Sequence, residues 1–237
     1  MKNTPKTISF FSRVLDIVAP RSCLICGRRL SVTEEAICTS CNMRLPRTGF
    51  ASEPHENEMA RLFWGRIPVE RCAAWIRFEP KSQVSNIIYQ MKYYGHSEIG
   101  MQLGNMVARD FDGMGFFEGI NAILPIPLTR KRERQRGYNQ SLEFARGVSE
   151  VTALDIENKA VRRKSFRGSQ TRKDWWERQD NVEGVFELMD SEQIHGKHIL
   201  IVDDVLTTGA TVAACARELL KAEGVKISVL TLAFAKN

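Results

Sequence analysis

The feature that most constrains this chain is an uninterrupted run of apolar residues that ends in two adjacent acids. The segment "KHILIVDD", residues 197–204, carries Asp203 and Asp204 at its end. Such a run, without polar alternation, is typical of a strand covered on both faces in a parallel sheet. The loop "LTTGAT", residues 206–211, follows, and "TVAACARELLKAEG" then predicts an amphipathic helix that ends at Gly224. A strand, a loop and a helix in this order indicate an α/β fold.

The chain from residue 71 onward repeats this alternation of strands and helices. Apolar patterns predict strands over 71–78, 121–127 and 225–235, and helices over 80–95, 97–111 and 138–150. Pro80 lies in the first turn of the first helix, and Gly95 ends it. Residues 46–69 are rich in Gly, Pro and polar residues and predict an irregular connection with one helical turn. Strands that alternate with helices favour a parallel sheet with flanking helices.

The net charge indicates which kind of partner the protein binds, and the hydropathy indicates in which compartment it lies. The 34 Lys and Arg against 28 Asp and Glu leave a formal net charge of +6, which suits phosphate esters, pyrophosphate or nucleic acid. "ISFFSRVLDIVAP", residues 8–20, predicts a short amphipathic helix and no signal peptide, because Arg13 and Asp16 interrupt its apolar residues. No other stretch approaches the roughly 20 apolar residues of a membrane span. We therefore expect a cytoplasmic protein without membrane insertion.

Four of the six cysteines have a spacing typical of a structural zinc site. They form the pattern C-x2-C-x11-C-x2-C and are Cys23, Cys26, Cys38 and Cys41. Two pairs of thiolates suit a tetrahedral Zn²⁺, and four thiolates leave no open coordination position for catalysis. A disulfide framework is an alternative, although nothing in the sequence indicates an oxidising compartment. A thioredoxin-like redox pair is another, but no βαβ pattern surrounds either pair.

The loop after the two acids has the composition of a phosphate site. A loop that enters a helix presents free backbone N–H groups and the positive end of the helix dipole, and Gly209 lets the backbone approach a ligand closely. Hydroxyl donors come from Thr207, Thr208 and Thr211. Two neighbouring carboxylates would repel a phosphate unless they accept hydrogen bonds from vicinal hydroxyls or approach Mg²⁺, so a ribose 5-phosphate meets both conditions. The alternative is that the acids cap a turn and the threonines fill a β-branched corner.

A basic segment follows the strand predicted over 121–127. The sequence "LTRKRERQRG", residues 128–137, includes Arg130 and Lys131 and contains a single acid. Such a cluster suits bidentate binding of phosphates. A solvated run of charges and a contact surface for nucleic acid are the alternatives.

A second basic segment spans residues 162–181. It contains seven Lys and Arg residues around the polar sequence "GSQT". Aromatic residues lie beside cations here and earlier in the chain: Trp175 and Trp176 in this segment, and Tyr93 and Tyr94 next to Lys92. Flat rings mixed with cations are typical of proteins that bind single-stranded nucleic acid. Ordinary half-buried packing of the rings is the alternative.

Three segments carry a resemblance to known families. "ILIVDDVLTTGAT", residues 199–211, resembles the phosphoribosyl pyrophosphate (PRPP) signature of type I phosphoribosyltransferases. Residues 124–140, "LPIPLTRKRERQRGYNQ", and residues 162–186 resemble the ComF/GntX family of competence-associated, phosphoribosyltransferase-like proteins, which also begins with a four-cysteine zinc module. The resemblance covers about residues 10–237. It implies a type I phosphoribosyltransferase domain behind a zinc module, PRPP and Mg²⁺ as ligands, and a role in DNA uptake during natural transformation beside other DNA-uptake proteins.

The resemblance also implies roles for individual residues. Asp203 and Asp204 would hold the ribose 2- and 3-hydroxyls, with Mg²⁺ nearby. The 5-phosphate would be bound by Thr207, Thr208, Gly209, Ala210 and Thr211. Arg130 and Lys131 would bind the pyrophosphate, and the segment 162–181 resembles the mobile loop that closes over it. Enzymes of this class that act on 6-oxopurines carry an acid two residues before the loop glycine, and Thr207 at that position argues against hypoxanthine or guanine as acceptor.

These patterns predict four regions and leave three functions open. The regions are an N-terminal helix (1–20), a zinc-binding module (21–46), a connection with the first strand (47–80) and a phosphoribosyltransferase-like domain (81–237). The functions are a PRPP-binding protein of DNA uptake that contacts single-stranded DNA, an active phosphoribosyltransferase of salvage or biosynthesis with an unidentified nitrogenous acceptor, and a regulator that senses PRPP. No catalytic base is evident, since lone histidines such as His55 and His96 are more often surface residues.

Overall fold

The core of the protein is a five-stranded parallel sheet with the strand order β1-β7-β6-β2-β3. The computed structural model describes residues 21–93, 97–164 and 184–235. The strands are β1 (Arg71–Arg77), β2 (Ala122–Pro125), β3 (Asp155–Ile156), β6 (His198–Leu206) and β7 (Lys226–Phe234). The apolar run of β6 is buried and lies between β2 and β7. The predicted α/β parallel sheet is therefore confirmed.

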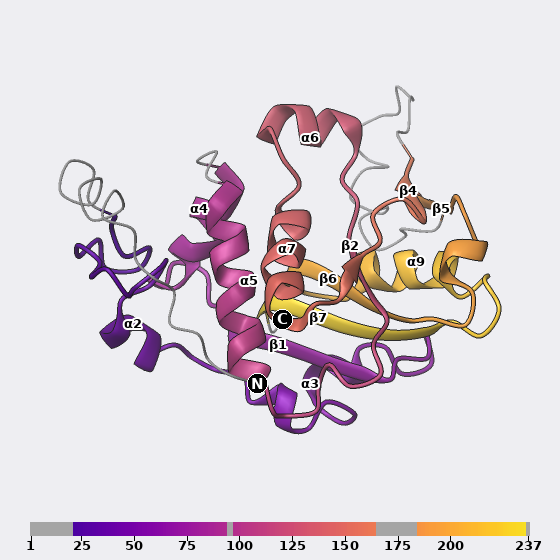
Figure 1. Cartoon of the computed structure of the whole chain (residues 1–237), viewed down its shortest axis with the longest axis horizontal. Coiled ribbons are helices and arrows are strands. Elements are labelled where there is room, and N and C mark those ends of the chain that lie inside the picture. The colour runs from indigo at the N-terminus through magenta and orange to yellow at the C-terminus, as the bar shows by residue number, and fades with distance from the viewer. Residues whose placement is uncertain (1–20, 94–96, 165–183, 236–237) are drawn as a thin grey trace.

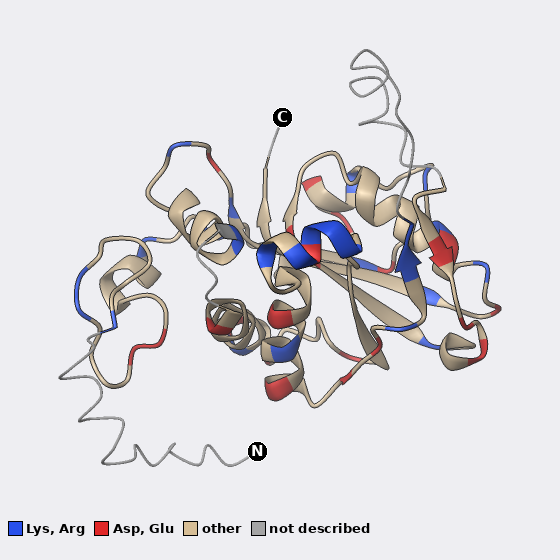
Figure 2. Cartoon of the chain, turned by 90° about the horizontal axis from the view of Figure 1, so that it is seen from above, with Lys and Arg blue, Asp and Glu red and all other residues tan. Residues whose placement is uncertain are grey.

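The connections between strands explain how helices cover the sheet. Helix α7 (Gln140–Thr152) leads from β2 to β3, and α9 (Ala210–Leu219) leads from β6 to β7. The strand order makes these two connections run in opposite directions along the sheet, so right-handed crossovers place the two helices on opposite faces. Figures 1 and 2 show this arrangement, with α5 (Ser97–Phe111) beside α7.

Helices α5 and α7 approach each other through glycines. A Cβ atom at Gly104 of α5 would lie 3.0 Å from the Cα atom of Gly147 of α7, and it would also overlap the carbonyl oxygen of Phe144. Only residues without a side chain allow the backbones to come so close. This contact fixes the position of α7, which carries Ser141 in its first turn.

The other described elements are short helices and one hairpin. They are α2 (Thr39–Met43), η1 (Phe50–Ser52), α3 (Glu58–Arg61), α4 (Ser85–Tyr93), α6 (Arg130–Arg136), η2 (Glu192–Ile194) and the antiparallel pair β4 (Val161–Arg163) and β5 (Phe186–Leu188). Helix α4 begins at Ser85 and not near Pro80, because residues 80–84 form turns in which Lys81 has a left-handed φ of 67°. Its predicted end at Gly95 lies outside the described residues.

The basic segment after β2, whose Arg130 and Lys131 were expected to bind pyrophosphate, contains the helix α6. The Thr129 side chain accepts a hydrogen bond from the Arg132 N–H at 3.3 Å and caps the start of α6. Gly137, with φ 82°, ends the helix. Both signals are local, and the Arg, Lys, Glu and Gln residues between them are good helix formers.

The cysteine-rich segment 21–46 is joined to the sheet through Arg47. The Arg47 guanidinium lies 4.1 Å from the centroid of the Trp75 ring on β1 and pairs with Asp110 of α5 at 2.7 Å. Asp110 also accepts a hydrogen bond from Trp75 Nε1 at 2.7 Å. A single hydrophobic cluster includes Cys23 and Leu30 of this segment together with the residues of the sheet. The module is therefore packed onto the sheet and held to it by charged contacts.

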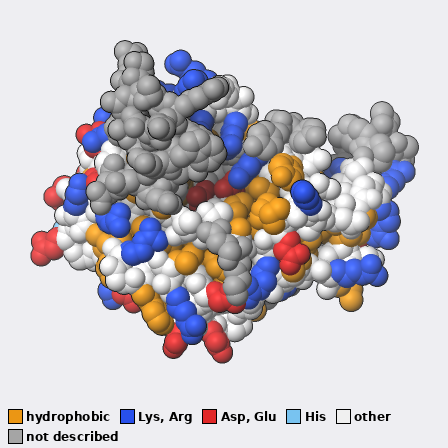
Figure 3. All heavy atoms as spheres, turned by 180° about the vertical axis from the view of Figure 1, so that it is seen from behind, with side chains coloured by type: hydrophobic (Ala, Val, Ile, Leu, Met, Phe, Trp, Pro, Cys, Tyr) orange, Lys and Arg blue, Asp and Glu red, His pale blue; other side chains and the backbone are white. Residues whose placement is uncertain are grey.

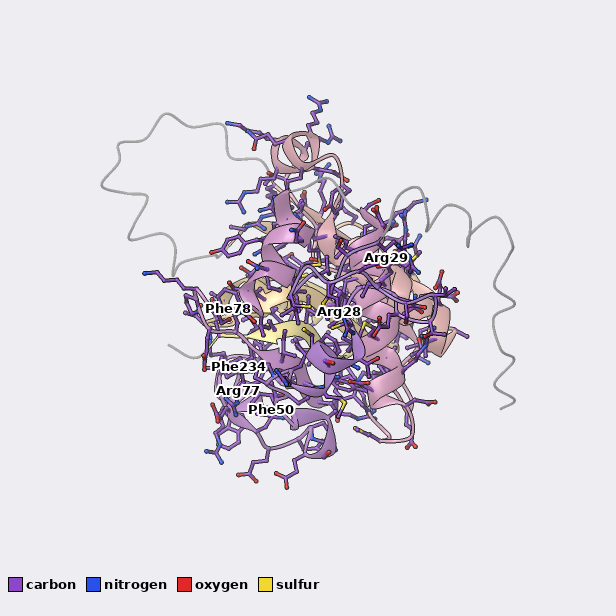
Figure 4. All side chains as sticks on the ribbon, turned by 90° about the vertical axis from the view of Figure 1, so that its left-hand side faces the viewer. Arg28, Arg29, Phe50, Arg77, Phe78 and Phe234 are labelled. Atoms are coloured by element: carbon purple, nitrogen blue, oxygen red, sulfur yellow. The ribbon has the colours of Figure 1, made fainter. Side chains whose placement is uncertain are left out.

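An aromatic cluster closes the carboxyl ends of β1 and β7. The rings of Phe50 and Phe234 meet edge to face at 5.6 Å, and the Arg77 guanidinium lies 5.3 Å from the centroid of the Phe50 ring. Figure 4 shows these side chains gathered with Phe78 on one side of the molecule. The cluster is stabilised by burial of the two rings.

Two further predictions from the sequence were an N-terminal helix and the lack of a membrane span. The helix expected over residues 1–20 lies outside the described residues. Within the described part, no helix is long and apolar enough to cross a membrane.

Candidate functional site

Asp203 lies near the carboxyl end of β6 and is held by α7. Its Oδ1 accepts a hydrogen bond from Ser141 Oγ at 2.9 Å and another from the Asp204 N–H at 2.9 Å. Among the described residues, none donates a hydrogen bond to its second carboxylate oxygen. Strand β6 runs to Leu206, two residues further than predicted, so both acids lie within the last residues of a strand that still pairs with β7. Asp203 is therefore rigidly placed and still able to accept a ligand hydroxyl.

Asp204 forms an ion pair with Lys92, which is far from it in the sequence. Its Oδ2 lies 3.0 Å from the Nζ of Lys92, near the end of α4, and its Oδ1 accepts the Val205 N–H at 2.7 Å. Both side chains of the ion pair are mostly buried, with exposed fractions of 23% for Lys92 and 13% for Asp204. Sequence reasoning noted Lys92 only as a neighbour of two tyrosines. No local signal pairs Lys92 with Asp204, because strand order and helix packing bring them together.

The electrostatics of the site favour a ligand that supplies positive charge or hydroxyl donors. Burial raises the pKa of the Asp203 carboxyl to about 7, and the negative charge of Asp204 contributes to this increase. Hydrogen bonds from the Asp204 N–H and Ser141 and the positive charge of Lys92 only partly offset it. Two adjacent ionised acids are therefore costly in the free protein, and hydrogen-bond donors or a cation from a ligand would relieve that cost.

This raised pKa predicts a pH-dependent effect of Asp203→Asn on stability. An acid whose pKa rises on folding destabilises the folded state above its unfolded pKa of about 4, and the penalty is complete above its folded pKa of about 7. The variant should therefore melt at a higher temperature than the parent at about pH 8, with a gain that shrinks towards about pH 4. Thermal melting across this range measures the difference. Asp112→Asn, at an exposed acid, is the control, and an equal gain at every pH would contradict the assignment.

The loop after β6 has the backbone geometry of a phosphate cradle. Gly209 has a left-handed φ of 71° and stands at the N-cap of α9, which begins at Ala210 and ends at Leu219, five residues before the predicted end. A Cβ atom at Gly209 would lie 3.0 Å from Cε1 of Phe63, so this position requires glycine for two reasons. Thr207 and Thr208 are exposed. The Ala210 N–H makes a long hydrogen bond of 3.4 Å to Thr208 Oγ1. The first N–H groups of a helix otherwise lack an intrahelical acceptor, so an anion can bind here.

A segment that sequence reasoning passed over supports this loop. The Arg66 Nη1 donates hydrogen bonds to the carbonyl oxygens of Thr208 at 2.8 Å and Leu62 at 3.2 Å. The ring of Phe63 is 1% exposed and packs against Gly209. Both residues lie in the turns that follow α3, whose N-cap is Asn57; the Asn57 side chain accepts hydrogen bonds from the N–H groups of Met59 and Ala60. The Asn57 cap was the only signal in the sequence, because residues 46–69 otherwise lack periodicity.

The predicted pyrophosphate residues lie on α6 and not beside the acids. Arg130 and Lys131 are both exposed, and neither contacts Asp203 or Asp204. Figure 3 shows acidic side chains in a recess at the centre of one face, with basic and apolar side chains around them. The assignment of Arg130 and Lys131 to pyrophosphate stays a prediction.

The hairpin supplies a further cation near the acids. Burial lowers the pKa of Arg163 on β4 and the positive charge of Arg132 lowers it further, whereas the negative charge of Asp203 raises it. Arg163 also lies 5.3 Å from the centroid of the Phe186 ring. It belongs to the basic segment 162–181, most of which, with Trp175 and Trp176, lies outside the described residues.

Of the two candidate histidines, only His55 lies in the part of the chain that the structure describes, and it is not near the acids. His55 donates a hydrogen bond through Nδ1 to the carbonyl oxygen of Glu70 at 2.8 Å, next to the start of β1 and therefore at the edge of the sheet opposite Asp203. His96 lies outside the described residues.

The four cysteines come together as their spacing predicts. Their sulfur atoms all lie within 4.8 Å of one another: Cys23, Cys26, Cys38 and Cys41. The Cys26 and Cys38 sulfurs are 3.8 Å apart, close to the separation of about 3.8 Å in a tetrahedron with Zn–S bonds of about 2.3 Å. Although burial opposes ionisation, hydrogen bonds from nearby backbone N–H groups lower the pKa of Cys23 to about 7. The cluster can hold a metal ion such as zinc.

The protein is therefore an α/β fold with paired acids, a threonine-rich loop and a helix N-terminus at the carboxyl edge of its parallel sheet, the edge at which open α/β folds bind ligands. Residues 106–237 match the phosphoribosyl transferase domain family, and the chain belongs to that family. The resemblance of the sequence to the ComF family is confirmed by its relatives.

Three of these relatives align along most of the chain. The DNA utilization protein YhgH of Escherichia coli is 26% identical over 226 residues, which cover 91% of this chain and 98% of the relative. Competence protein F of Haemophilus influenzae is 23% identical over 228 residues, which cover 90% of this chain and 96% of the relative. Competence protein ComFC of Bacillus subtilis is 25% identical, with 89% of this chain and 76% of the relative covered.

Proposed function

We propose that this protein binds PRPP with Mg²⁺ and acts in DNA utilisation, in the uptake of DNA during natural transformation, where it contacts single-stranded DNA. The observation that carries the PRPP site is the arrangement of Asp203 and Asp204 directly before the Gly209 loop and the start of α9. Relatives named as DNA utilization and competence proteins support the biological role, since they align along nearly the whole chain.

Each part of the proposed site has a separate task. The two carboxylates accept hydrogen bonds from the ribose 2- and 3-hydroxyls, which replace the repulsion between the acids with favourable contacts. The backbone N–H groups from Gly209 to Thr211 and the threonine hydroxyls bind the 5-phosphate. Arg130 and Lys131 bind the pyrophosphate when α6 and the hairpin approach the ligand.

The donor set fits Mg²⁺. Carboxylate oxygens are the ligands that Mg²⁺ prefers, and Asp203 keeps one such oxygen that accepts no hydrogen bond from the described residues. The raised pKa of Asp203 also indicates a position where a cation is favoured. When bound, Mg²⁺ would neutralise charge on the pyrophosphate. At the other end of the chain, the four thiolates would hold zinc as a structural ion.

Phosphoribosyl transfer to a nitrogenous acceptor is the second candidate, and the proximity of the two acids, the Gly209 loop and the start of α9 supports it. In that reaction the bond between C1 and the pyrophosphate oxygen breaks, a bond from the acceptor nitrogen to C1 forms, and the nitrogen proton passes to solvent. Thr207 stands where enzymes for 6-oxopurines are expected to carry an acid, so we propose an acceptor other than hypoxanthine or guanine.

The deciding experiment is a calorimetric titration with PRPP in the presence and absence of Mg²⁺. We expect saturable binding that requires Mg²⁺ and is weaker for ribose 5-phosphate and for pyrophosphate, because each of these makes only part of the contacts. A screen for pyrophosphate release over bases and amines then separates binding from transfer. Absence of PRPP binding by the folded protein would overturn the proposed function.

A further inference from the structure

A second pocket lies between the residues that follow β2 and the β4–β5 hairpin. Its volume is about 750 Å³, and the residues that line it include neither Asp203 nor the loop 207–211. Five cations line it, against two acids: Arg130, Lys159, Arg162, Arg163 and Lys164, with Glu133 and Glu187. Figure 2 shows basic residues along α6 and on the hairpin. The pocket is therefore strongly positive.

Most of these cations are not neutralised by the described part of the protein. Arg162 pairs with Glu187 at 2.7 Å. Arg130, Lys159 and Lys164 form no ion pair with a described residue, although the charge of Lys164 acts on Glu187. The nearby charge of Arg132 acts against that of Arg163. Like charges held together without partners cost free energy, which an anionic ligand recovers. The pocket has the charge of an anion site.

The pocket also has an apolar part. Pro127, Leu128 and Val161 line it together with Met189, whose side chain is 50% exposed. An inorganic anion would gain no binding free energy from contact with these apolar side chains. A nucleotide has both a charged phosphate and a flat, weakly polar base, which packs well against thioether and aliphatic groups. The two parts of the pocket therefore match the two parts of a nucleotide.

We propose that this pocket binds a nucleotide unit of single-stranded DNA, with the phosphodiester on the cations and the base against Met189 and its apolar neighbours. The proposal rests on the proposed function in DNA utilisation and assigns to it a pocket that does not include the acid pair. Arg130, which we assign to pyrophosphate, also lines this pocket, whereas Lys159 and Met189 have no proposed contact with PRPP. Arg163 belongs to the pocket and also interacts with Asp203, so a bound strand passes beside the phosphoribosyl site. The pyrophosphate of PRPP offers the same phosphate chemistry, and the experiment separates the two ligands.

The test uses Lys159→Glu with Met189→Glu and a matched control. Both side chains are exposed, so the fold is retained. The control, Lys226→Glu with Met114→Glu, makes the same changes of residue type and charge. Met114 is 49% exposed, and Lys226 starts β7 at the amino edge of the sheet, opposite the pocket. Binding of a labelled oligothymidylate is followed by fluorescence anisotropy at several salt concentrations, and PRPP affinity is measured by calorimetry on the same samples.

We expect the pocket variant to bind the oligonucleotide at least tenfold more weakly and the control less than twofold more weakly, with PRPP affinity unchanged in both. The salt dependence should also decrease, by roughly 0.7 in the log–log slope for each phosphate that the variant no longer neutralises. Equal decreases in affinity in the two variants, or no oligonucleotide binding by the parent protein at low salt, would overturn the proposal while leaving PRPP binding intact. A pocket variant with weakened PRPP binding instead would assign the pocket to pyrophosphate and would also overturn it.

Discussion

Replacement of Cys23 by Ser is expected to release the metal ion and to unfold the segment 21–46. The Cys23 side chain is 3% exposed, and its sulfur accepts the Cys38 N–H at 3.3 Å, so the residue organises both halves of the cluster. The segment contains only one short helix, α2, and draws little stability from regular structure. Structural zinc supplies on the order of 10 kcal/mol to small modules of this kind, which is comparable to the stability of a whole domain.

Metal analysis and limited proteolysis measure this effect. The parent protein should contain about one equivalent of zinc, as a site filled by four thiolates requires. Cys23→Ser should lose the metal, become less soluble and be cleaved within the segment. Cys72→Ala is the matched control, because Cys72 is buried in β1 and belongs to no cysteine cluster among the described residues. A metal-free parent protein with four freely titrating thiols, and a Cys23→Ser variant that melts at the same temperature as the parent, would contradict this prediction.

The second large effect is expected from Asp203→Asn combined with Asp204→Asn. The amides keep the size of the side chains but remove both negative charges that would face the ribose hydroxyls and Mg²⁺. Each hydrogen bond to a charged group that is removed is worth roughly 1.5 to 3 kcal/mol, so PRPP affinity should fall tenfold or more. The fold should persist, because Asp203 is costly to ionise and the amide oxygen of an asparagine in its place can still accept the hydrogen bond from Ser141.

Calorimetry with PRPP and Mg²⁺ on the folded variant checks this result. The control removes two exposed acids from the opposite edge of the sheet, Asp112→Asn with Glu118→Gln, and should leave the affinity unchanged. Melting curves confirm that both variants are folded. Unaltered PRPP affinity in the Asp203 and Asp204 variant would rule out the acids as ribose ligands.

The sequence by itself determined the features that depend on neighbouring residues. The apolar run of β6 predicts a buried strand because a strand covered on both faces needs no polar alternation. The residues 206–211 predict a loop that leads into a helix, and the spacing of the cysteines predicts a four-sulfur cluster, because each property depends on residues close together in the chain. Helix α6 was not predicted although Thr129 and Gly137 mark its ends, because its charges were interpreted as a phosphate-binding cluster. The cap residues at both ends are local signals, so this helix was predictable from the sequence.

The tertiary structure alone decided which distant residues complete the site. Ser141 lies 62 positions before Asp203 in the chain, yet it binds its carboxylate. Lys92 reaches Asp204 in the same way, and Arg66 reaches the carbonyl oxygen of Thr208 across 142 positions. No pattern within a segment encodes these pairs. They follow from the strand order and from the close packing of α5 on α7, because a parallel sheet brings the ends of separate strands and helices to one edge.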